Sequence, residues 1–515
     1  MNGAELIMKT AAKAGIEVCF TNFGTTEVPL ALAFDSEPGV RPVLALFEGV
    51  CTGAADGYGR MAGRPAMTLL HLGPGFANGI ANLQNAKRAR TPLVNLVGEH
   101  ATQHIPLDAP LAMNIEALAG TVSGWHRTTR SPGDLSRDVA DAAAASQYGQ
   151  ISTLIVPSNY QEAEVTGNKI ALPGFAFDPV DEDSIRRAVH LMRSYDKVAL
   201  ILGGRALRER GLQTAGRIIA AKQCDLLTDF LPGFMDRGAG LPEVIRIPYF
   251  PEPAIELLSR YEAVVICGTK EPVSFFGYRG IRGTLLSESQ ARSVIASPKQ
   301  DPIEALEHLA DSLGAPRGAA PRLDRGLSRP SVPQGVLTNE KACQTLTAMQ
   351  PEGAIIVDEG ISSAFPYYGL SSGSLPHTLT TIAGGALGYG MPCSIGAAMA
   401  CPDRPVINLQ ADGSALYTVQ ALWTQAQQGL NITTLICSNR RYNILKLELE
   451  RAGITSPGPH IRSILDIDNP PIGWPKLAEA MGVAAVSVDT AEELAKHIEL
   501  ALAEPGPHLV EMITS

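Results

Sequence analysis

Short runs of strand-forming residues alternate with helical segments along almost the whole chain of 515 residues. Because a helix between two strands returns the chain to the same edge of a sheet, this alternation predicts parallel sheets covered by helices. At about 100–200 residues per domain, the length suggests about three domains. We therefore expect an α/β protein with three doubly wound parallel-sheet domains.

The alternation divides the chain into three blocks and one linker. Residues 313–336 are rich in Pro, Gly and Arg, a composition that indicates a linker. In the middle block, the apolar runs Lys197–Gly203 and Ala263–Gly268 end in glycine, as in half of a Rossmann-like unit. We favour a tight turn without a ligand at each of these steps. The expected division is residues 1–165, 180–312, 313–336 (the linker) and 337–515.

Charge and hydropathy exclude several classes of protein. The formal net charge is -10, so no basic excess is available to meet nucleic-acid phosphates or an anionic membrane surface. No apolar run approaches the ~20 residues that span a bilayer. Met1–Ala14 carries Glu5 and Lys9 within its apolar stretch, which predicts an amphipathic helix rather than a signal peptide. We expect a cytoplasmic protein that binds neither nucleic acid nor membrane.

The eight cysteines are scattered along the chain and form no CxxC pair. Most of them have apolar neighbours in the sequence. We therefore expect buried, reduced thiols rather than a structural zinc site or a disulfide framework.

The strongest chemical signal is Ala411-Asp412-Gly413-Ser414, followed by Asn439 27 residues after the aspartate. An apolar run precedes each element, so two neighbouring parallel strands would bring Asp412 and Asn439 to the same carboxyl edge of a sheet. Carboxylate and amide oxygens are hard ligands that suit Mg²⁺, which completes its octahedron with phosphate oxygens and water. The Gly413-Ser414 turn also opens a helix whose N–H groups can face a phosphate. The pattern predicts a site for Mg²⁺ and a diphosphate.

A second signal is Glu48, which follows an apolar run and starts a helix of small residues. A carboxylate in such a dehydrated position is expected to have a raised pKa and could share a proton with a ligand nitrogen. Helix capping is an equally good explanation of this residue in isolation.

A third signal is the turn His71-Leu72-Gly73-Pro74-Gly75, which follows the apolar run Ala66–Leu70. Asn78 stands where a dinucleotide-binding fingerprint requires its third glycine, so that interpretation is weak. The Gly-Pro-Gly turn instead indicates that another backbone or a cofactor approaches closely.

Together, these three segments resemble the thiamine-diphosphate (ThDP) enzymes of the pyruvate decarboxylase and acetolactate synthase superfamily. The resemblance covers essentially the whole chain. It implies a pyrimidine-binding domain, a middle domain and a diphosphate-binding domain, in that order. Two positions depart from the pattern of the family, with Ala411 and Ser438 in place of the usual Gly and Asn, but Asp412 and Asn439 are kept.

The resemblance implies a role for each matching residue. Glu48 would bond N1′ of the cofactor's pyrimidine, Gly385 would accept from the 4′-amino group, and Leu387 would be the apolar wedge that bends ThDP. Asp412 and Asn439 would bind Mg²⁺ together with the carbonyl of Arg441. Further cofactor contacts are implied for Ser362, Gly413, Ser414, Ala415 and Tyr442.

The implied activity is ThDP- and Mg²⁺-dependent decarboxylation or carboligation of 2-oxo acids, through a C2-ylid and an enamine. The nearest local match is to benzoylformate decarboxylase. His71 lies 23 residues after Glu48, at the place of a catalytic histidine, and Thr25 stands where that enzyme has an active-site serine. A second active-site histidine of that enzyme, expected in the middle block, is missing. The corresponding stretch, Gly268–Gly280, has Phe275, Phe276 and Tyr278 instead.

Other members of the superfamily remain as alternatives. A pyruvate decarboxylase would carry paired histidines, for which His100 and His104 are the nearest candidates, and an acidic residue where this chain has Leu445. An acetolactate synthase-like carboligase, a ThDP-dependent C–C hydrolase and a non-catalytic paralogue are also open. The middle block has no clear flavin signature, which argues against FAD. Apolar character around Tyr442, Leu445 and Leu449 favours an aromatic or branched 2-oxo acid.

The resemblance also implies an oligomer. Glu48 and the Mg²⁺ site lie on different domains, which in this family meet across a subunit interface. We therefore expect a homodimer or homotetramer, with active sites between subunits and a small 2-oxo acid or related carbonyl compound as substrate.

Overall fold

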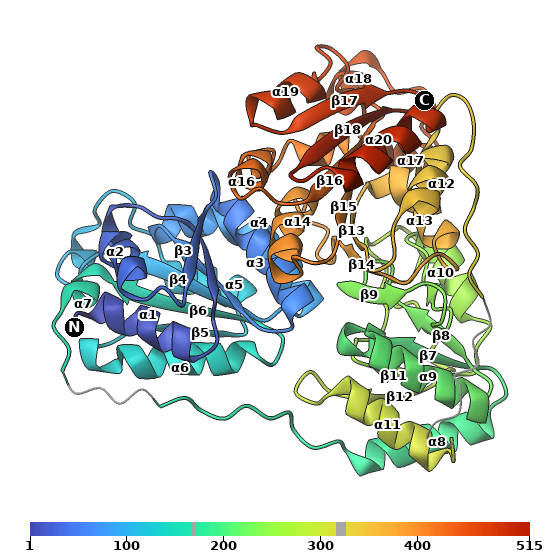
Figure 1. Cartoon of the computed structure of the whole chain (residues 1–515). Coiled ribbons are helices and arrows are strands. Elements are labelled where there is room, and N and C mark those ends of the chain that lie inside the picture. The colour runs from blue at the N-terminus through green and yellow to red at the C-terminus, as the bar shows by residue number, and fades with distance from the viewer. Residues whose placement is uncertain (167–170, 316–325, 515) are drawn as a thin grey trace. The chain divides into compact units, whose positions relative to one another are not determined.

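The computed structural model describes residues 1–166, 171–315 and 326–514. These residues form two compact units: one comprises Met1–Phe175, Pro330–Leu370 and Ile382–Ser515, and the other comprises Ala176–Arg329 and Ser371–Thr381. Residues 316–325 of the expected linker lie outside the described residues. Each unit is described below by itself, in the labels of Figure 1.

The N-terminal part of the first unit is a six-stranded sheet in which all pairings are parallel. Its strand order is β2-β1-β3-β4-β6-β5. The strands are β1 (Val18–Asn22), β2 (Arg41–Leu44), β3 (Ala66–Leu70), β4 (Leu93–Glu99), β5 (Trp125–Thr128) and β6 (Ile151–Pro157).

Helices cover both faces of this sheet (Figure 1). On one face lie α1 (Gly3–Lys13), α2 (Val28–Ser36) and α6 (Leu135–Ser146), and on the other lie α3 (Glu48–Ala62), α4 (Leu72–Ala89) and α5 (Ile115–Val122). The predicted amphipathic helix at the N-terminus is confirmed as α1. Asn2 and Glu5 form a capping box at its start, and its residues Leu6 and Ile7 belong to the core against the sheet.

The C-terminal part of the first unit contains five parallel strands in the order β17-β18-β16-β15-β13. The strands are β13 (Ile355–Glu359), β15 (Val406–Ala411), β16 (Ile432–Ser438), β17 (Ala484–Val488) and β18 (His508–Ile513). The main helices of this part are α12 (Asn339–Met349), α14 (Gly390–Ala400), α16 (Ala421–Gln427), α17 (Asn443–Arg451), α19 (Trp474–Ala480) and α20 (Ala491–Ala503).

Helices α3 and α14 join the two parts of the first unit, and glycines let their backbones approach closely. A Cβ on Gly57 of α3 would lie 2.1 Å from the carbonyl oxygen of Cys393, and a Cβ on Gly396 of α14 would lie 1.9 Å from that of Ala54. The small residues of the predicted helix after Glu48 are therefore explained by helix packing.

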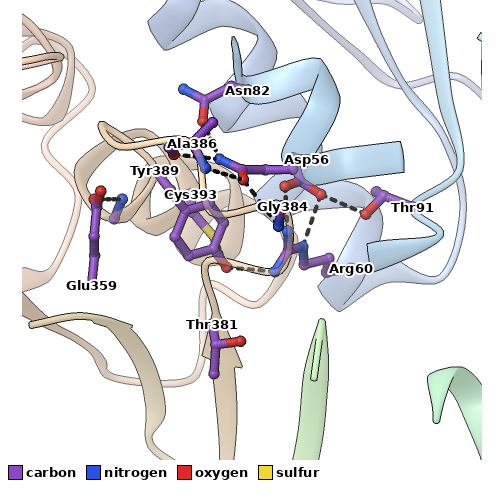
Figure 2. Close-up of polar contacts among 12 residues, drawn as sticks. Asp56, Arg60, Asn82, Thr91, Glu359, Thr381, Gly384, Ala386, Tyr389 and Cys393 are labelled. Atoms are coloured by element: carbon purple, nitrogen blue, oxygen red, sulfur yellow. Dashed lines mark hydrogen bonds and ion pairs between the residues drawn. The ribbon is translucent and has the colours of Figure 1, made fainter. Parts of the chain in front are cut away.

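A buried ion pair lies at the same contact (Figure 2). Arg60 and Asp56 both have fully buried side chains and are joined by an Nε–Oδ1 bond of 2.8 Å. Arg60 also donates to the hydroxyl of Tyr389 at 2.8 Å, and Thr91 donates to Asp56. This network holds α3 against the segment that begins α14.

Replacing Arg60 by methionine should strongly destabilise the fold, because it leaves the Asp56 carboxylate buried without its cation. Breaking one partner of a buried pair typically costs about 3–5 kcal/mol of unfolding free energy. Arg64, whose ion pair with Glu17 is exposed, provides the control, since R64M should cost at most about 1 kcal/mol. Urea unfolding measures both values, and equal effects of the two substitutions would contradict the assignment.

The second unit contains a parallel five-stranded sheet in the order β10-β8-β7-β11-β12. It also contains an antiparallel pair, β9 (Phe234–Arg237) with β14 (His377–Thr381), which the sequence did not predict. The sheet strands are β7 (Val198–Leu202), β8 (Asp225–Thr228), β10 (Ile245–Arg246), β11 (Ala263–Cys267) and β12 (Ala291–Ala296), and the main helices are α8 (Glu182–Ser194), α9 (Glu209–Ala221), α10 (Pro251–Leu258) and α11 (Pro302–Ser312).

The two glycine-terminated strands of the middle block have a packing explanation. A Cβ on Gly203 would lie 2.6 Å from the Cβ of Thr269, and one on Gly268, at φ +74°, would lie 2.3 Å from the carbonyl oxygen of Gly203. The two glycines therefore permit the ends of neighbouring strands β7 and β11 to approach each other. The preferred interpretation, a tight turn rather than half of a nucleotide site, fits this geometry.

The expected fold class is confirmed. The cysteines are unpaired, and all but the partly buried Cys401 are buried, as expected. Within the described residues, no helix is both long and apolar enough to cross a membrane.

Candidate active site

The two elements of the strongest sequence signal meet as expected. Strands β15 and β16 are parallel neighbours, with Ala411 opposite Cys437 at their carboxyl ends. Asp412 follows β15 and Asn439 follows β16. Together with the segment after β13 and Leu387, they line one pocket of about 360 Å³, part of it open to solvent. Its lining residues are Gly360, Ile361, Ser362, Ser363, Leu387, Ala411, Asp412, Gly413, Ser414, Asn439, Arg441, Tyr442, Asn443 and Ile444.

Asp412 is a buried carboxylate at the floor of this pocket. Burial raises its pKa to about 6, although its oxygens accept from the backbone N–H groups of Gly413 at 2.8 Å and Arg440 at 2.6 Å. A cation beside Asp412 would offset the cost of burying its charge. Asn439 accepts from the N–H of Arg441 at 3.1 Å, and the carbonyl of Arg441 accepts from the N–H of Asn443 at 3.0 Å.

The oxygen atoms of Asp412, Asn439 and the Arg441 carbonyl fit Mg²⁺ only together with a bound group that brings further oxygens. The described residues contain no group of three or more His, Cys, Asp or Glu side chains arranged for a metal. One carboxylate, one amide oxygen and one carbonyl are the few protein ligands with which Mg²⁺ is usually held when phosphate oxygens and water complete the octahedron. The pocket therefore fits a Mg²⁺-diphosphate group rather than an isolated metal ion.

Hydroxyl groups surround the same space. Ser362 accepts from the side chain of Asn443 at 3.2 Å, and Ser414 accepts from Gln410 at 2.7 Å and donates to the carbonyl of Ala411 at 3.1 Å. Ala415 is fully buried and is not among the lining residues. Its contact with the diphosphate stays a prediction.

Three non-glycine residues with left-handed backbone follow the carboxyl ends of strands, two in the C-terminal part and one in the N-terminal sheet. Ile361, Arg440 and Leu72 have φ values of +49°, +57° and +50° and follow β13, β16 and β3, respectively. Ile361 is the most costly, because a β-branched side chain is strongly disfavoured there. Such strain persists where surrounding contacts enforce it, and it concentrates at functional sites.

The segment 384–388, which carries Gly385 and Leu387, is held by side chains of α4 (Figure 2). Asn85 accepts from the N–H groups of Gly384 at 3.1 Å and Ala386 at 3.2 Å, and it donates to the carbonyl of Ala386 at 2.8 Å. Gly385 itself has φ +72°, which favours glycine at this position. The segment therefore has a fixed shape before any ligand binds.

Asn82 links this segment to the start of α3. Its side chain donates to the carbonyl of Gly388 at 3.0 Å and to that of Gly49 at 2.9 Å, and it accepts from Asn85 at 2.9 Å. Two asparagines thus connect the backbone beside Glu48 with the backbone beside Leu387. The sequence analysis missed both residues.

Glu359 holds the same segment from the C-terminal sheet. Its fully buried carboxylate accepts from the N–H groups of Gly388 at 2.7 Å and Gly390 at 2.6 Å, and from the amide of Gln410 at 3.0 Å. Burial raises the pKa of Glu359 to about 7, while these hydrogen bonds act in the opposite direction. Both oxygens accept from N–H groups, so only the ionised form satisfies all the donors.

Binding of ThDP, the cofactor that the sequence resemblance implies, should therefore weaken as the pH falls through about 7. Protonation of Glu359 replaces one acceptor by an O–H group that faces an N–H donor. The raised pKa has the opposite effect on stability: the cost of ionising the buried carboxyl is full above pH 7 and fades as the pH falls towards the unfolded-state value. Titration of ThDP between pH 6.5 and 8 measures the effect. E359Q should bind ThDP weakly across this range with little pH dependence, and a pH dependence equal to that of the wild type would refute this role.

Glu48 lies at the carboxyl edge of the N-terminal sheet, as the first residue of α3. Its carboxylate accepts from Asn78 at 3.0 Å, and a Cβ on Gly75 would lie 3.1 Å from the Glu48 Oε1. Gly75 of the Gly-Pro-Gly turn thus leaves room for Glu48. In the single chain Glu48 is partly buried, at the rim where α3 begins, and its dehydrated environment stays a prediction.

His71 and Thr25 lie at the same edge, at the ends of β3 and β1. His71 is the N-cap residue of α4, and Thr25 is exposed in the short helix Thr25–Glu27. The Nδ1 atom of His71 lies 2.7 Å from a carboxylate oxygen of Glu27. The sequence analysis did not single out Glu27, although an acidic residue beside the apolar Val-Pro-Leu run was a usable signal.

The remaining candidates from the sequence lie in several places. His100 and His104 follow β4, with ring centroids 5.3 Å apart, and His104 is exposed. Tyr442 lines the pocket, whereas Leu445 and Leu449 are not among its lining residues. Phe275 and Phe276 belong to the second unit, where they form part of an exposed aromatic cluster.

Comparison with known proteins identifies the family. Residues 1–118 match the family described as thiamine pyrophosphate enzyme, N-terminal TPP binding domain, and residues 363–512 match the corresponding C-terminal TPP binding domain. A Mycobacterium tuberculosis protein named "Putative acetolactate synthase large subunit IlvX" is 44% identical over 516 residues, which cover 100% of this chain and 99% of the relative. The chain belongs to the thiamine pyrophosphate enzymes, within the group of 2-oxo acid decarboxylases and acetolactate synthases.

More distant relatives cover the whole chain as well. Benzoylformate decarboxylase from Pseudomonas aeruginosa is 26% identical, over 97% of this chain and 96% of the relative. The solved structure of a thiamine diphosphate-dependent 4-hydroxybenzoylformate decarboxylase from Rhodococcus jostii RHA1 has a TM-score of 0.85 at 22% identity, and the match covers 100% of this chain and 99% of that one. The predicted family and ThDP as cofactor are confirmed, and the likeness to the solved structure confirms the fold.

Proposed function

We propose that this enzyme is a ThDP- and Mg²⁺-dependent decarboxylase or carboligase of 2-oxo acids, similar to benzoylformate decarboxylase. The observation that carries the proposal is the convergence of Asp412, Asn439, Ser362 and Leu387 on one pocket, in a family that binds ThDP. His71 and Thr25, at the edge that also carries Glu48, support the decarboxylase assignment.

The C-terminal part of the first unit would hold the metal and the diphosphate end of the cofactor. Asp412, Asn439 and the carbonyl of Arg441 would bind Mg²⁺, while Ser362, Gly413 and Ser414 would contact the diphosphate. Leu387 and Gly385 would contact the rest of the cofactor, and Tyr442 would cover the diphosphate end. When bound, ThDP supplies a nucleophilic carbon for the substrate carbonyl and an electron sink for the loss of CO₂.

The chain's own groups would orient the reactants and move protons. Glu48 would hold a proton at the pyrimidine N1′, and Asn78 would fix the orientation of its carboxylate. The imidazole of His71 would relay a proton near the reacting carbonyl at near-neutral pH. The hydroxyl of Thr25 would donate to the carboxylate of the substrate.

A second candidate is a carboligase that joins two 2-oxo acids. The specific support is the Mycobacterium tuberculosis relative, whose printed name refers to an acetolactate synthase large subunit. The middle region of the chain offers no flavin signature, so we propose no FAD for either candidate.

Product analysis distinguishes these candidates. Purified apo-protein is supplied with Mg²⁺, ThDP and, in turn, pyruvate, 2-oxoisovalerate and benzoylformate. Formation of an aldehyde from benzoylformate would support the decarboxylase. Acetolactate from pyruvate would support the synthase and overturn the first assignment. Cleavage of a cyclic diketone without CO₂ release from any 2-oxo acid would overturn both and indicate a C–C hydrolase.

We further propose that the enzyme is at least a homodimer whose active sites combine Glu48 of one subunit with the Asp412 pocket of the other. E48Q and D412A should each be inactive alone, but their co-expression should restore activity. In a random mixture of a symmetric dimer, about a quarter of all sites would then carry both native residues. Activity of the co-expressed pair no higher than that of either variant alone would contradict the shared site.

A further inference from the structure

Glu27 is the most enclosed acidic side chain at the carboxyl edge of the N-terminal sheet. It is fully buried, while its neighbour Thr25 is exposed. Its Oε2 atom lies 2.7 Å from the Nδ1 atom of His71 and accepts from the N–H of Gly24 at 2.9 Å, and its Oε1 atom accepts from the hydroxyl of Thr26 at 2.6 Å. Both oxygens of the carboxylate are therefore engaged, and none of the partners is a permanent cation.

The backbone around this pair is shaped to hold it. A Cβ on Gly98, in β4, would lie 1.7 Å from the Glu27 Oε1, and a Cβ on Gly24 would lie 2.4 Å from the ring of His71. No other amino acid fits at either position without displacing the carboxylate or the imidazole. Two glycines from different strand ends thus create the space for a pair formed by the buried Glu27 carboxylate and the partly exposed His71 imidazole.

The contact defines the state of the imidazole. A buried carboxylate at 2.7 Å from Nδ1 requires a proton on that nitrogen, since two unprotonated acceptors would repel each other. The tautomer of a histidine is set by the hydrogen bond that one of its ring nitrogens makes. In neutral His71, the nitrogen able to accept a proton is then Nε2.

The same carboxylate also ties His71 to the loop that carries Thr25. Its Oε2 atom is shared between the imidazole and the N–H of Gly24, the residue directly before Thr25. A change in the position of Glu27 would therefore move both groups to which the proposed function assigns contact with the substrate.

We propose that Glu27 is a positioning residue that fixes His71 as the Nδ1–H tautomer and locks the Thr25 loop to it. This inference rests on the proposed function for its effect on turnover, but not for its effect on the tautomer. Two other carboxylates lie near this pair: Glu48 at the start of α3, which approaches His71 around Gly75, and Glu99 at the end of β4, which interacts electrostatically with Glu27. The backbone N–H of His100 donates to Glu99. The carboxylate of Glu27 is the one in direct contact with the imidazole.

Two substitutions separate geometry from charge. E27Q is nearly isosteric: its amide oxygen can still accept from His71 and Gly24, and its NH₂ group can donate to Thr26, so the tautomer should be retained while the negative charge is lost. E27L removes the carboxylate and leaves only the hydroxyl of Thr26, 3.3 Å from Nδ1, as a weaker acceptor. The Nε2–H tautomer of His71 should then gain population. D35N, at an exposed aspartate on α2, is the matched control for a lost carboxylate.

The first readout is solid-state ¹⁵N NMR of histidine-labelled holoenzyme at a pH where His71 is neutral, with the His71 signals identified by subtracting the spectrum of H71Q. The wild type, D35N and E27Q should show the Nδ1–H tautomer, and E27L should not. An Nε2–H tautomer in the wild type, or an unchanged tautomer in E27L, would overturn the proposal. Even if E27L does not fold, an Nε2–H tautomer in the wild type would overturn the proposal.

The second readout is turnover of the 2-oxo acid that the product assay identifies. In the E27L variant, kcat should fall by about 10²-fold, the lower end of the range for a lost general acid–base, with an unchanged Kd for ThDP. The kcat of E27Q should fall by less than that of E27L. If E27L changes the tautomer of His71 but not kcat, then Glu27 does position His71, but His71 takes no part in turnover. That result would overturn the proposed catalytic role of His71 and not the positioning by Glu27.

Discussion

Replacing Glu48 by glutamine is expected to lower kcat by about 10²–10⁴-fold, the range for loss of a positioned proton-transfer group, while Mg²⁺ and ThDP remain bound. Glutamine keeps the size of the side chain and a partner for Asn78, but it cannot hold the shared proton that the proposed role requires. The Asp412 pocket does not include Glu48, so the diphosphate contacts should survive.

Steady-state kinetics and a ThDP titration of the same protein sample separate these effects. E37Q, at the end of α2 in the same part of the first unit, is the control, and it should retain the kinetics of the wild type. A wild-type kcat for E48Q would disprove the role of Glu48. A loss of ThDP binding equal to the loss of kcat would indicate that Glu48 acts in binding instead.

Replacing Asp412 by alanine is expected to abolish tight binding of ThDP. Residues that only support a metal ligand typically change affinity by 10–100-fold when mutated, so loss of a direct ligand should weaken Mg²⁺-dependent ThDP binding by at least about 100-fold. The apo-protein should remain folded, because the substitution also removes a buried charge that burial disfavours.

Calorimetric titration with ThDP in the presence of Mg²⁺ tests this expectation. Asp403 is exposed in the segment before β15, at the opposite end of that strand, so D403A is the matched control and should bind as the wild type does. An unchanged Kd for D412A would refute the metal site. A Kd that changes equally with and without Mg²⁺ would show that Asp412 does not act through the metal.

The sequence was sufficient to locate the edges at which the candidate site lies. Runs of apolar residues predicted the strands before Asp412, Asn439 and His71, and parallel strands bring their carboxyl ends to one edge. The prediction of a Mg²⁺-diphosphate site needed only this topology and the ligand preferences of the metal. The structure brings Asp412 and Asn439 to one pocket, as the topology required.

The supporting residues could not be predicted in the same way. Asn85 contacts Ala386, 301 positions away in the sequence, and Glu359 contacts Gly388 and Gly390 across a different part of the fold. Such contacts depend on how helices pack, and no periodicity or local motif encodes them. The position of Glu27 illustrates the same limit, because its role follows from the space that Gly24 and Gly98 provide.

Helix packing also explains the small residues after Glu48, which the sequence had suggested as surroundings of a reactive carboxylate. The small residues after Glu48 were interpreted as surroundings that dehydrate the carboxylate, but Gly57 serves the close contact between α3 and α14. Glu48 itself stays partly exposed at the rim. The proposed shared site would place a second subunit over it.

We expect this chain to release CO₂ from a 2-oxo acid only with ThDP and Mg²⁺ in place. The most direct measurement is CO₂ release by the apo-protein from benzoylformate, 2-oxoisovalerate and pyruvate under four conditions: no addition, Mg²⁺ alone, ThDP alone, and both. We predict CO₂ release from at least one acid with both additions and little or none under the other three conditions. Absence of CO₂ release under all four conditions from a protein that binds ThDP, or release that is independent of ThDP, would contradict it.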